Sequence, residues 1–291
     1  MKCELCPRKC NIDRSQSIGY CGANEEISLA LCNLHFSEEP CISGTNGSGT
    51  IFFSGCNLRC VYCQNYDVSR MKIAKSVSIS RLAEIFKELE DMGAENINLV
   101  TPTHYANQIM AALDIYRPSI PIVYNTNGYE SLETIRQLKD YVDIYLTDFK
   151  YYDSALSGRL SGATNYKDMA TIALKEMLNN QPNNIFDKDK LIKGVIVRHL
   201  VLPNHTDDSI RVLDHIYNTF GNGVTISLMS QYTPMGDISN HTDINRCLKP
   251  IEYKIVLSHL EKLGFSGYMQ ELSSATNSYI PHFDYTGVEK K

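Results

Sequence analysis

From residue 49 onward, short apolar runs alternate with longer amphipathic stretches. The runs are rich in β-branched and aromatic residues and are bounded by turn formers, a pattern that predicts strands. Six strands are predicted, at residues 50–54, 97–101, 121–125, 142–147, 194–202 and 225–230.

The stretches between these runs carry helical periodicity. Apolar residues at i, i+3, i+4 and i+7 form one stripe along a helix, which can lie on a sheet. Residues 80–92 have such a stripe in Leu82, Ile85, Phe86 and Leu89. A comparable stripe near the C-terminus consists of Ile251, Ile255, Leu260 and Leu263.

Near-continuous apolar strands that alternate with helices predict an α/β fold, with a parallel sheet covered by helices and right-handed crossovers. Six such units can curl into a partial (β/α)6 barrel or remain an open doubly wound sheet. In either arrangement the active site is expected at the C-terminal ends of the strands.

The first 48 residues have little periodic pattern and contain six of the ten cysteines. Glycines and short polar residues in residues 43–49 favour a boundary there. The sequence therefore predicts a small Cys-rich, metal-binding region at 1–48, followed by a core domain with a C-terminal extension at 49–291.

Composition narrows the class of protein. The 291 residues are 43% hydrophobic and 21% charged, which is ordinary for a soluble globular chain. No run approaches the roughly 18 apolar residues of a membrane span, and the N-terminus lacks a signal-peptide core. A cytoplasmic protein without a membrane partner is expected. The net charge of -5 argues against sequence-blind binding to nucleic acid.

A C-x3-C-x2-C triad, Cys56, Cys60 and Cys63, directly follows the first predicted strand. A [4Fe-4S] cluster used for electron transfer is normally held by four cysteines, so three thiolates leave one iron open to a substrate or cofactor. The alternative is a structural zinc loop. Zinc sites usually pair two knuckles and close the tetrahedron with a fourth ligand, so the triad favours a cluster.

A second cysteine array lies at the N-terminus. Cys3, Cys6, Cys10 and Cys21 offer four thiolates at spacings that either an auxiliary [4Fe-4S] cluster or a structural zinc ion can close. Cys32 and Cys41 could replace one of the four, or could be buried thiols. Cys247 is isolated and is expected to be inert.

Polar residues follow several other predicted strands, where the C-terminal ends of parallel strands meet. Asp148 and Lys150 point to one side of their strand by its alternation. Arg198 interrupts an apolar run, where a charge is costly without a partner. The residues at these strand ends are Thr101, Thr103, Thr126, Asn127, Asp148, Lys150 and Arg198.

The triad and its flanking residues resemble the signature of the radical S-adenosylmethionine (SAM) superfamily, whose fold is a partial barrel. The resemblance implies that the open iron chelates the amino and carboxylate groups of SAM. An electron, from a donor such as flavodoxin or ferredoxin, then cleaves SAM to methionine and a 5′-deoxyadenosyl radical that abstracts hydrogen. Tyr62 matches the aromatic residue usually found beside the adenine.

Further segments resemble an uncharacterised branch related to the pyruvate formate-lyase activating enzymes. They are residues 3–10, 35–44, 54–60 and 270–271. This resemblance implies SAM contacts from the strand-end residues. Asn125 replaces an aspartate that contributes to a cation site in that family, and Gln231 stands near a position where activating enzymes often carry a histidine.

The implied reaction is hydrogen abstraction from a protein or peptide, such as a glycine of a glycyl-radical enzyme. Radical chemistry on a small metabolite or RNA is the alternative within catalysis. An iron-sulfur electron carrier or a metal-binding scaffold is the alternative outside it, and a carrier would need a fourth ligand for the triad cluster.

Overall fold

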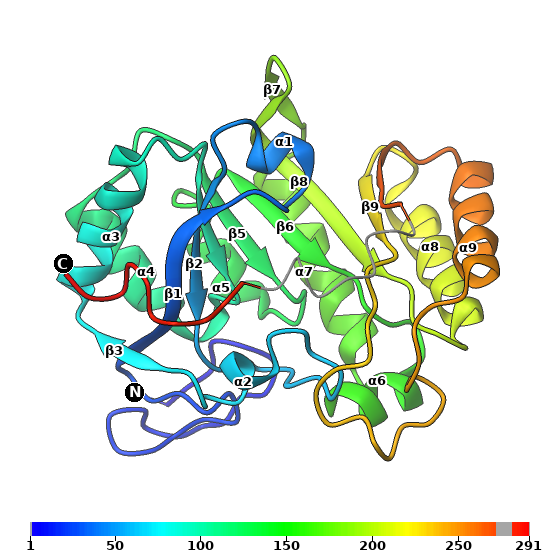
Figure 1. Ribbon diagram of the computed structural model, residues 1–291, viewed down its shortest axis with the longest axis horizontal. Coiled ribbons are helices and arrows are strands. Elements are labelled where there is room, and N and C mark those ends of the chain that lie inside the picture. Colours follow the sequence, from blue (N-terminus) through cyan, green and yellow to red (C-terminus); the bar gives the residue numbers. More distant parts are fainter. Residues whose placement is uncertain (1, 272–280, 291) are drawn as a thin grey trace.

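The computed structural model describes residues 2–271 and 281–290, and within them ten strands form one mostly parallel sheet (Figure 1). The strand order is β10-β9-β8-β6-β5-β4-β2-β1-β3, and β7 pairs with β8 outside this path. The sheet does not close in the described part of the chain, because β3 and β10 each pair with a single neighbour. The predicted α/β fold is confirmed as an open, partial barrel.

All six predicted strands are present and run parallel to one another. They are β2 (Ser48–Phe53), β4 (Ile97–Val100), β5 (Ile122–Thr126), β6 (Ile144–Asp148), β8 (Lys190–Leu200) and β9 (Thr225–Met229). The near-complete burial of β2, β4, β5 and β6 explains why these strands read as continuous apolar runs.

The sequence prediction missed four strands: β1 (Ile27–His35), β3 (Lys75–Val77), β7 (Ile185–Asp187) and β10 (Gly267–Met269). The last three have only three residues each, too few to show a period. β1 belongs to the region assigned to residues 1–48, yet it pairs antiparallel with β2 and is buried along its first six residues. β10 adds a further parallel strand beside β9.

Helices cover the sheet between its strands (Figure 1). They are α1 (Pro40–Ser43), α2 (Tyr66–Ser69), α3 (Ile79–Asp91), α4 (Ala106–Ile115), α5 (Leu132–Gln137), α6 (Ser154–Ser161), α7 (Tyr166–Asn180), α8 (Thr206–Phe220) and α9 (Pro250–Leu263), with a 3-10 turn at Thr103–Tyr105. Among these described helices, none has both the length and the apolar character needed to cross a membrane.

The two predicted apolar stripes have different outcomes. In α3, all four stripe residues are buried, and Ser78 caps the helix by accepting a hydrogen bond from the Arg81 backbone N–H at 3.1 Å. In α9 the helix is present but the predicted stripe is wrong, because Ile251 and Ile255 are 60% and 45% exposed. The buried face starts at Tyr253, which lies about 200° around the helix from Ile251.

Candidate functional site

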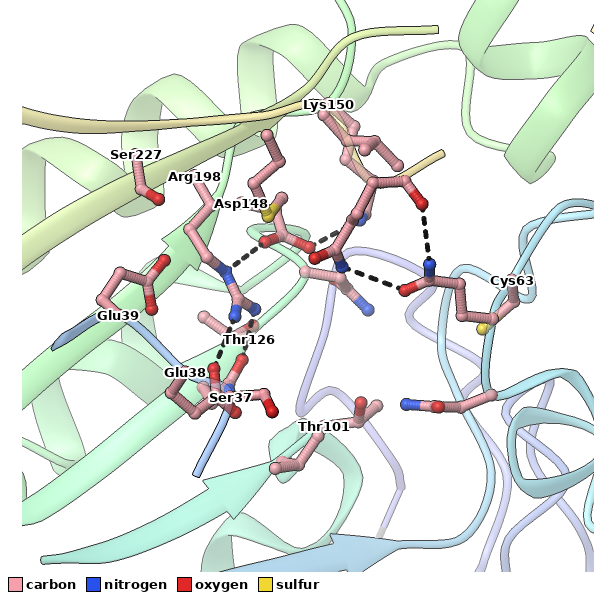
Figure 2. A pocket seen from close by; sticks show the side chains of 18 of the residues that line it. Ser37, Glu38, Glu39, Cys63, Thr101, Thr126, Asp148, Lys150, Arg198 and Ser227 are labelled. Carbon is pink, nitrogen blue, oxygen red and sulfur yellow. Dashed lines mark hydrogen bonds and ion pairs between the residues drawn. The ribbon is translucent and has the colours of Figure 1, made fainter. Parts of the chain in front are cut away.

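A cavity of about 420 Å³ opens at the C-terminal ends of the parallel strands (Figure 2). Its wall combines the triad loop, the strand ends and the segment between β1 and α1. Seven of the eight predicted SAM contacts line it together with all three triad cysteines: Tyr62, Thr101, Thr126, Asn127, Asp148, Lys150, Arg198, Cys56, Cys60 and Cys63. The fold therefore brings most of the predicted site to one place.

The triad loop leaves β2 through Gly55, whose φ is +92°. A Cβ atom at this position would lie 2.7 Å from the backbone oxygen of Cys21. The next residue, Cys56, donates its backbone N–H to that same oxygen at 3.1 Å. A glycine is thus required both by the left-handed backbone and by the close approach of the N-terminal region.

Hydrogen-bond donors lie beside two of the three triad sulfurs. Ser161 Oγ lies 2.9 Å from Cys60 Sγ, and Asn127 Nδ2 and the Leu58 backbone N–H each lie 3.4 Å from Cys56 Sγ. Burial raises the pKa of Cys60, and burial together with its neighbouring thiols raises that of Cys63 to about 12. Bound iron would reverse this shift, because a coordinating thiol is deprotonated outright.

The residues present fit a cluster held by three thiolates. In the described part of the chain, no three His, Cys, Asp or Glu side chains stand at the spacing of ligands to a single metal ion. The thiolates of a cluster each bind a different iron, so they stand farther apart than ligands of one ion. Three thiols on one cavity wall, with donors aimed at two of the sulfurs, suit that arrangement.

Asp148, Lys150 and Arg198 form an ion-pair network on another wall of the cavity (Figure 2). Lys150 Nζ lies 2.5 Å from Asp148 Oδ2, and Arg198 Nε lies 3.0 Å from Asp148 Oδ1. Burial disfavours the Asp148 carboxylate, but the charges of Lys150 and Arg198 outweigh it and hold the pKa below its usual value. The network keeps two cations oriented toward the cavity.

Arg198 also reaches residues that the sequence reasoning did not assign to the site. Its guanidinium donates to Glu38 Oε2 at 3.2 Å and to Asn125 Oδ1 at 2.5 Å. Glu38 and Glu39 line the cavity from the turn between β1 and α1. The 35–44 segment is part of the family resemblance, but its contact with Arg198 depends on β1, which the sequence pattern does not predict.

The structure places Thr103 away from the cavity. Its side chain is fully buried and donates a hydrogen bond of 2.5 Å to Glu130 Oε1. Thr126 lines the cavity and donates to the same oxygen, while Tyr124 donates to the other at 3.4 Å. Burial raises the pKa of Glu130 to about 7. Thr103 therefore supports Thr126 through Glu130.

Two further contacts organise the site near the triad. Tyr62 Oη lies 2.6 Å from Tyr151 Oη, which lies 2.6 Å from Ser161 Oγ, the group that faces Cys60. On the other side, Asn127 Nδ2 donates to Asn57 Oδ1 at 2.7 Å. Both contacts tie a predicted SAM contact to the triad loop.

A chain of glutamines connects the triad loop to the last strands. Gln231 Nε2 donates to Gln64 Oε1 at 3.0 Å, and Gln270 Nε2 donates to Gln231 Oε1 at 2.8 Å. All three residues line the cavity. Gln231, noted only as a replacement for a histidine, thus helps to close the cavity wall.

The N-terminal thiols lie near enough to influence one another's charge. Burial raises the pKa of Cys6 to about 12, and the nearby Cys21 thiol adds a smaller effect. Burial also raises the pKa of Cys21, with smaller effects from Cys3 and Cys10. The four thiols stay a predicted site for a second cluster or zinc. The other two N-terminal cysteines, Cys32 in β1 and Cys41 in α1, are buried thiols, and Cys247 is exposed.

Arg8, within the N-terminal array, ties it to the triad loop. Its guanidinium donates to the Asn57 backbone oxygen at 2.8 Å and to that of Ser161 at 2.9 Å. The same group stacks 3.9 Å from the centre of the Tyr20 ring. The array is therefore attached to the triad loop and to the end of α6, the two segments that carry Asn57 and Ser161.

Comparison with known proteins agrees with this site. The pattern of the Radical SAM superfamily matches residues 50–216. The chain is also 33% identical over 270 residues to an uncharacterized protein of Methanocaldococcus jannaschii, covering 89% of this chain and 74% of that protein. The chain belongs to the radical SAM superfamily. It is a radical SAM enzyme, a class that uses a [4Fe-4S] cluster and SAM.

Solved structures share the fold at low sequence identity. Streptococcus suis SuiB bound to SAM is 13% identical with a TM-score of 0.52, over 76% of this chain and 49% of SuiB. The chain thus spans about half the length of SuiB. Methylornithine synthase PylB is 12% identical with a TM-score of 0.50, over 74% of this chain and 68% of that one. A radical SAM methyltransferase from Sphaerobacter thermophilus is 12% identical with a TM-score of 0.50, over 77% and 66%.

Proposed function

We propose that this enzyme holds SAM against a cluster on Cys56, Cys60 and Cys63 and abstracts hydrogen from a peptide or protein, with a glycine as the activase-like target. The observation that carries the proposal is that the three thiols and the Asp148 network open onto one cavity. A pure electron carrier has no use for a buried cavity with oriented cations beside an incompletely ligated cluster.

The side chains on the cavity wall have distinct roles in this proposal. Lys150, fixed by Asp148, pairs with the carboxylate of SAM, a strong and orienting contact in a dry pocket. Tyr62 packs against the adenine, and Thr126 and Asn127 contact the ribose or methionine part. When bound, the cluster and SAM supply a reductive cleavage that yields a hydrogen-abstracting radical, and the buried wall keeps water away from it.

The position of β10 supports a peptide substrate. Tyr268 and Met269 of this strand line the cavity, and β10 pairs with β9 alone among the described strands. An extended peptide can align with such an edge through main-chain hydrogen bonds. SuiB, whose fold is similar with a TM-score of 0.50, has also been solved with its precursor peptide SuiA. The cavity volume alone also suits a small metabolite, which is the second candidate.

The first experiment tests SAM cleavage. The anaerobically reconstituted enzyme should form 5′-deoxyadenosine when SAM and dithionite are added, and Cys60→Ala should form none. Cys247→Ala is the matched control, because Cys247 is exposed and does not line the cavity. Absence of 5′-deoxyadenosine from wild-type enzyme with a loaded triad cluster would contradict the proposal.

A second experiment tests the substrate class. Extracts from cells grown on glycine deuterated at its α-carbon are separated into protein and small-molecule fractions and added to the reaction. Deuterium in 5′-deoxyadenosine is expected with the protein fraction. Transfer of deuterium from the small-molecule fraction alone would show that the substrate is a metabolite and not a peptide.

A further inference from the structure

Glu39 is a buried cavity carboxylate without a cation of its own. Its side chain lines the cavity, and the residue is only 8% exposed. The Oε2 atom is buried and accepts no hydrogen bond from any residue that the structure describes. Leaving a buried carboxylate oxygen unpaired is costly unless a ligand supplies the missing donor.

The other charges on the cavity wall are already paired. Lys150 and Arg198 both bind Asp148, and Arg198 also binds Glu38. The wall therefore has three carboxylates and two cations, and among the described residues Glu39 is in no ion pair. Burial raises the pKa of Glu39, and nearby Arg198 and the Ser227 hydroxyl offset only part of that effect. A cation bound in the cavity would therefore stabilise the charged form of Glu39.

The backbone of Glu39 is fixed at the start of α1, and its side chain lies in the part of the cavity remote from the triad. Its backbone oxygen accepts the N–H groups of Ile42 and Ser43 at 2.8 and 3.0 Å at the start of α1. Figure 2 shows Glu39 and Ser227 on one side of the cavity and Cys63 on the other. With SAM proposed to bind at the triad and Lys150, the Glu39 side of the cavity is available to another molecule.

We propose that Glu39 binds a primary ammonium group, so that the substrate is an amine such as a lysine side chain or a peptide amino terminus. An ammonium is a compact point charge that needs only one carboxylate oxygen, whereas a guanidinium binds best to two together, and Arg198 and Ser227 already lie beside Glu39. This inference rests on the proposed function in one respect, namely that the cavity is the substrate site.

The test compares two tripeptide probes, Gly-Lys-Gly and Gly-norleucine-Gly, which differ mainly by the charged amine. Each is titrated calorimetrically, with acetylated N-termini, into reconstituted enzyme holding SAM without reductant. The lysine probe should bind at least about tenfold more tightly. Glu39→Gln should remove this preference and Glu39→Asp should keep part of it, while Glu261→Gln, an exposed site on α9, should leave it unchanged.

Three results would overturn the inference: equal binding of the two probes, binding of neither, or a preference that survives in Glu39→Gln. Thermal unfolding of each variant establishes that it is folded. Because no reductant is present, binding is independent of SAM cleavage. Wild-type enzyme that prefers the lysine probe but forms no 5′-deoxyadenosine contradicts only the proposed function, and the reverse result contradicts only the inference.

Discussion

At the scale of single residues, the site is defined by how each buried charge is compensated. Asp148 has a cation on each oxygen, whereas Glu130 has only hydroxyl donors. Burial therefore has opposite outcomes: the pKa of Asp148 is lowered by its cations, and that of Glu130 is raised to about 7. The two carboxylates should respond differently to substitution and to pH.

Asp148→Asn should destabilise the fold by about 3 kcal/mol, because it leaves the buried Lys150 without its counter-charge. Urea unfolding measures the difference. Asp67→Asn is the matched control, since the Asp67–Lys72 pair is exposed and its loss should change stability by less than about 1 kcal/mol. Equal effects of the two substitutions would show that the buried network adds no stability.

Glu130 should make stability fall as pH rises. Its folded pKa of about 7 exceeds the ordinary 4.5, so between these values the folded state keeps a proton that the unfolded state has lost. The stabilisation is complete below pH 4.5 and is lost as pH rises through 7, with a total of up to about 3 kcal/mol. Urea unfolding at several pH values should show a flatter profile for Glu130→Gln; an unchanged profile would contradict this assignment.

At the scale of elements, the triad loop depends on contacts with the N-terminal region. Gly55 passes beside the Cys21 backbone oxygen, and Arg8 holds the oxygens of Asn57 and Ser161. The loop has no long helix or strand of its own to fix it; α2 spans only Tyr66–Ser69. Contacts from the N-terminal region therefore determine the shape of the triad loop.

Gly55→Ala should lower both the melting temperature and the iron content, because a Cβ atom cannot stand 2.7 Å from the Cys21 backbone oxygen. Gly223→Ala is the control, since a Cβ atom there meets nothing within 4 Å. Thermal unfolding and iron analysis follow the two effects. Normal iron content in Gly55→Ala would mean that the loop adapts without losing its ligand geometry.

At the scale of the whole molecule, the N-terminal segment packs against the triad loop, where the Cys56 backbone N–H donates to the Cys21 oxygen at 3.1 Å. The C-terminal residues return to β1, where the Cys32 backbone N–H donates to the Thr286 oxygen at 2.8 Å. The N-terminal region, the sheet and the C-terminal end are thus packed together. Loss of metal from one set of cysteines should therefore lower the stability of the whole molecule.

Replacing Cys3 and Cys6 together should remove the N-terminal metal and lower the melting temperature, while triad iron is retained. Cys60→Ala should have the reverse effect on metal content. Iron and zinc analysis with absorption spectra distinguishes the two sites. The same measurement tells whether the N-terminal site holds iron or zinc. Simultaneous loss of all metal in either variant would contradict two independent sites.

Local sequence patterns determined much of this protein. The six parallel strands, helix α3, the triad and the strand-end Asp148, Lys150 and Arg198 could all be predicted, because strand period, loop spacing and the rule that parallel strands end at one edge are local or topological properties. The helix α9 was also predicted, but its buried face was not, since an apolar stripe does not say which neighbour covers it.

Only the tertiary structure decided which distant groups meet. Glu38 lies 160 residues from Arg198, and Thr103 lies 27 residues from Glu130. Nothing in either segment alone indicates these contacts, because a buried charge or hydroxyl takes its partner from whatever the packed chain brings beside it. The sequence determined how this enzyme starts its chemistry; the packing of the β1–α1 turn against β8 and β9 placed the unpaired Glu39 carboxylate, from which we infer the substrate's charge.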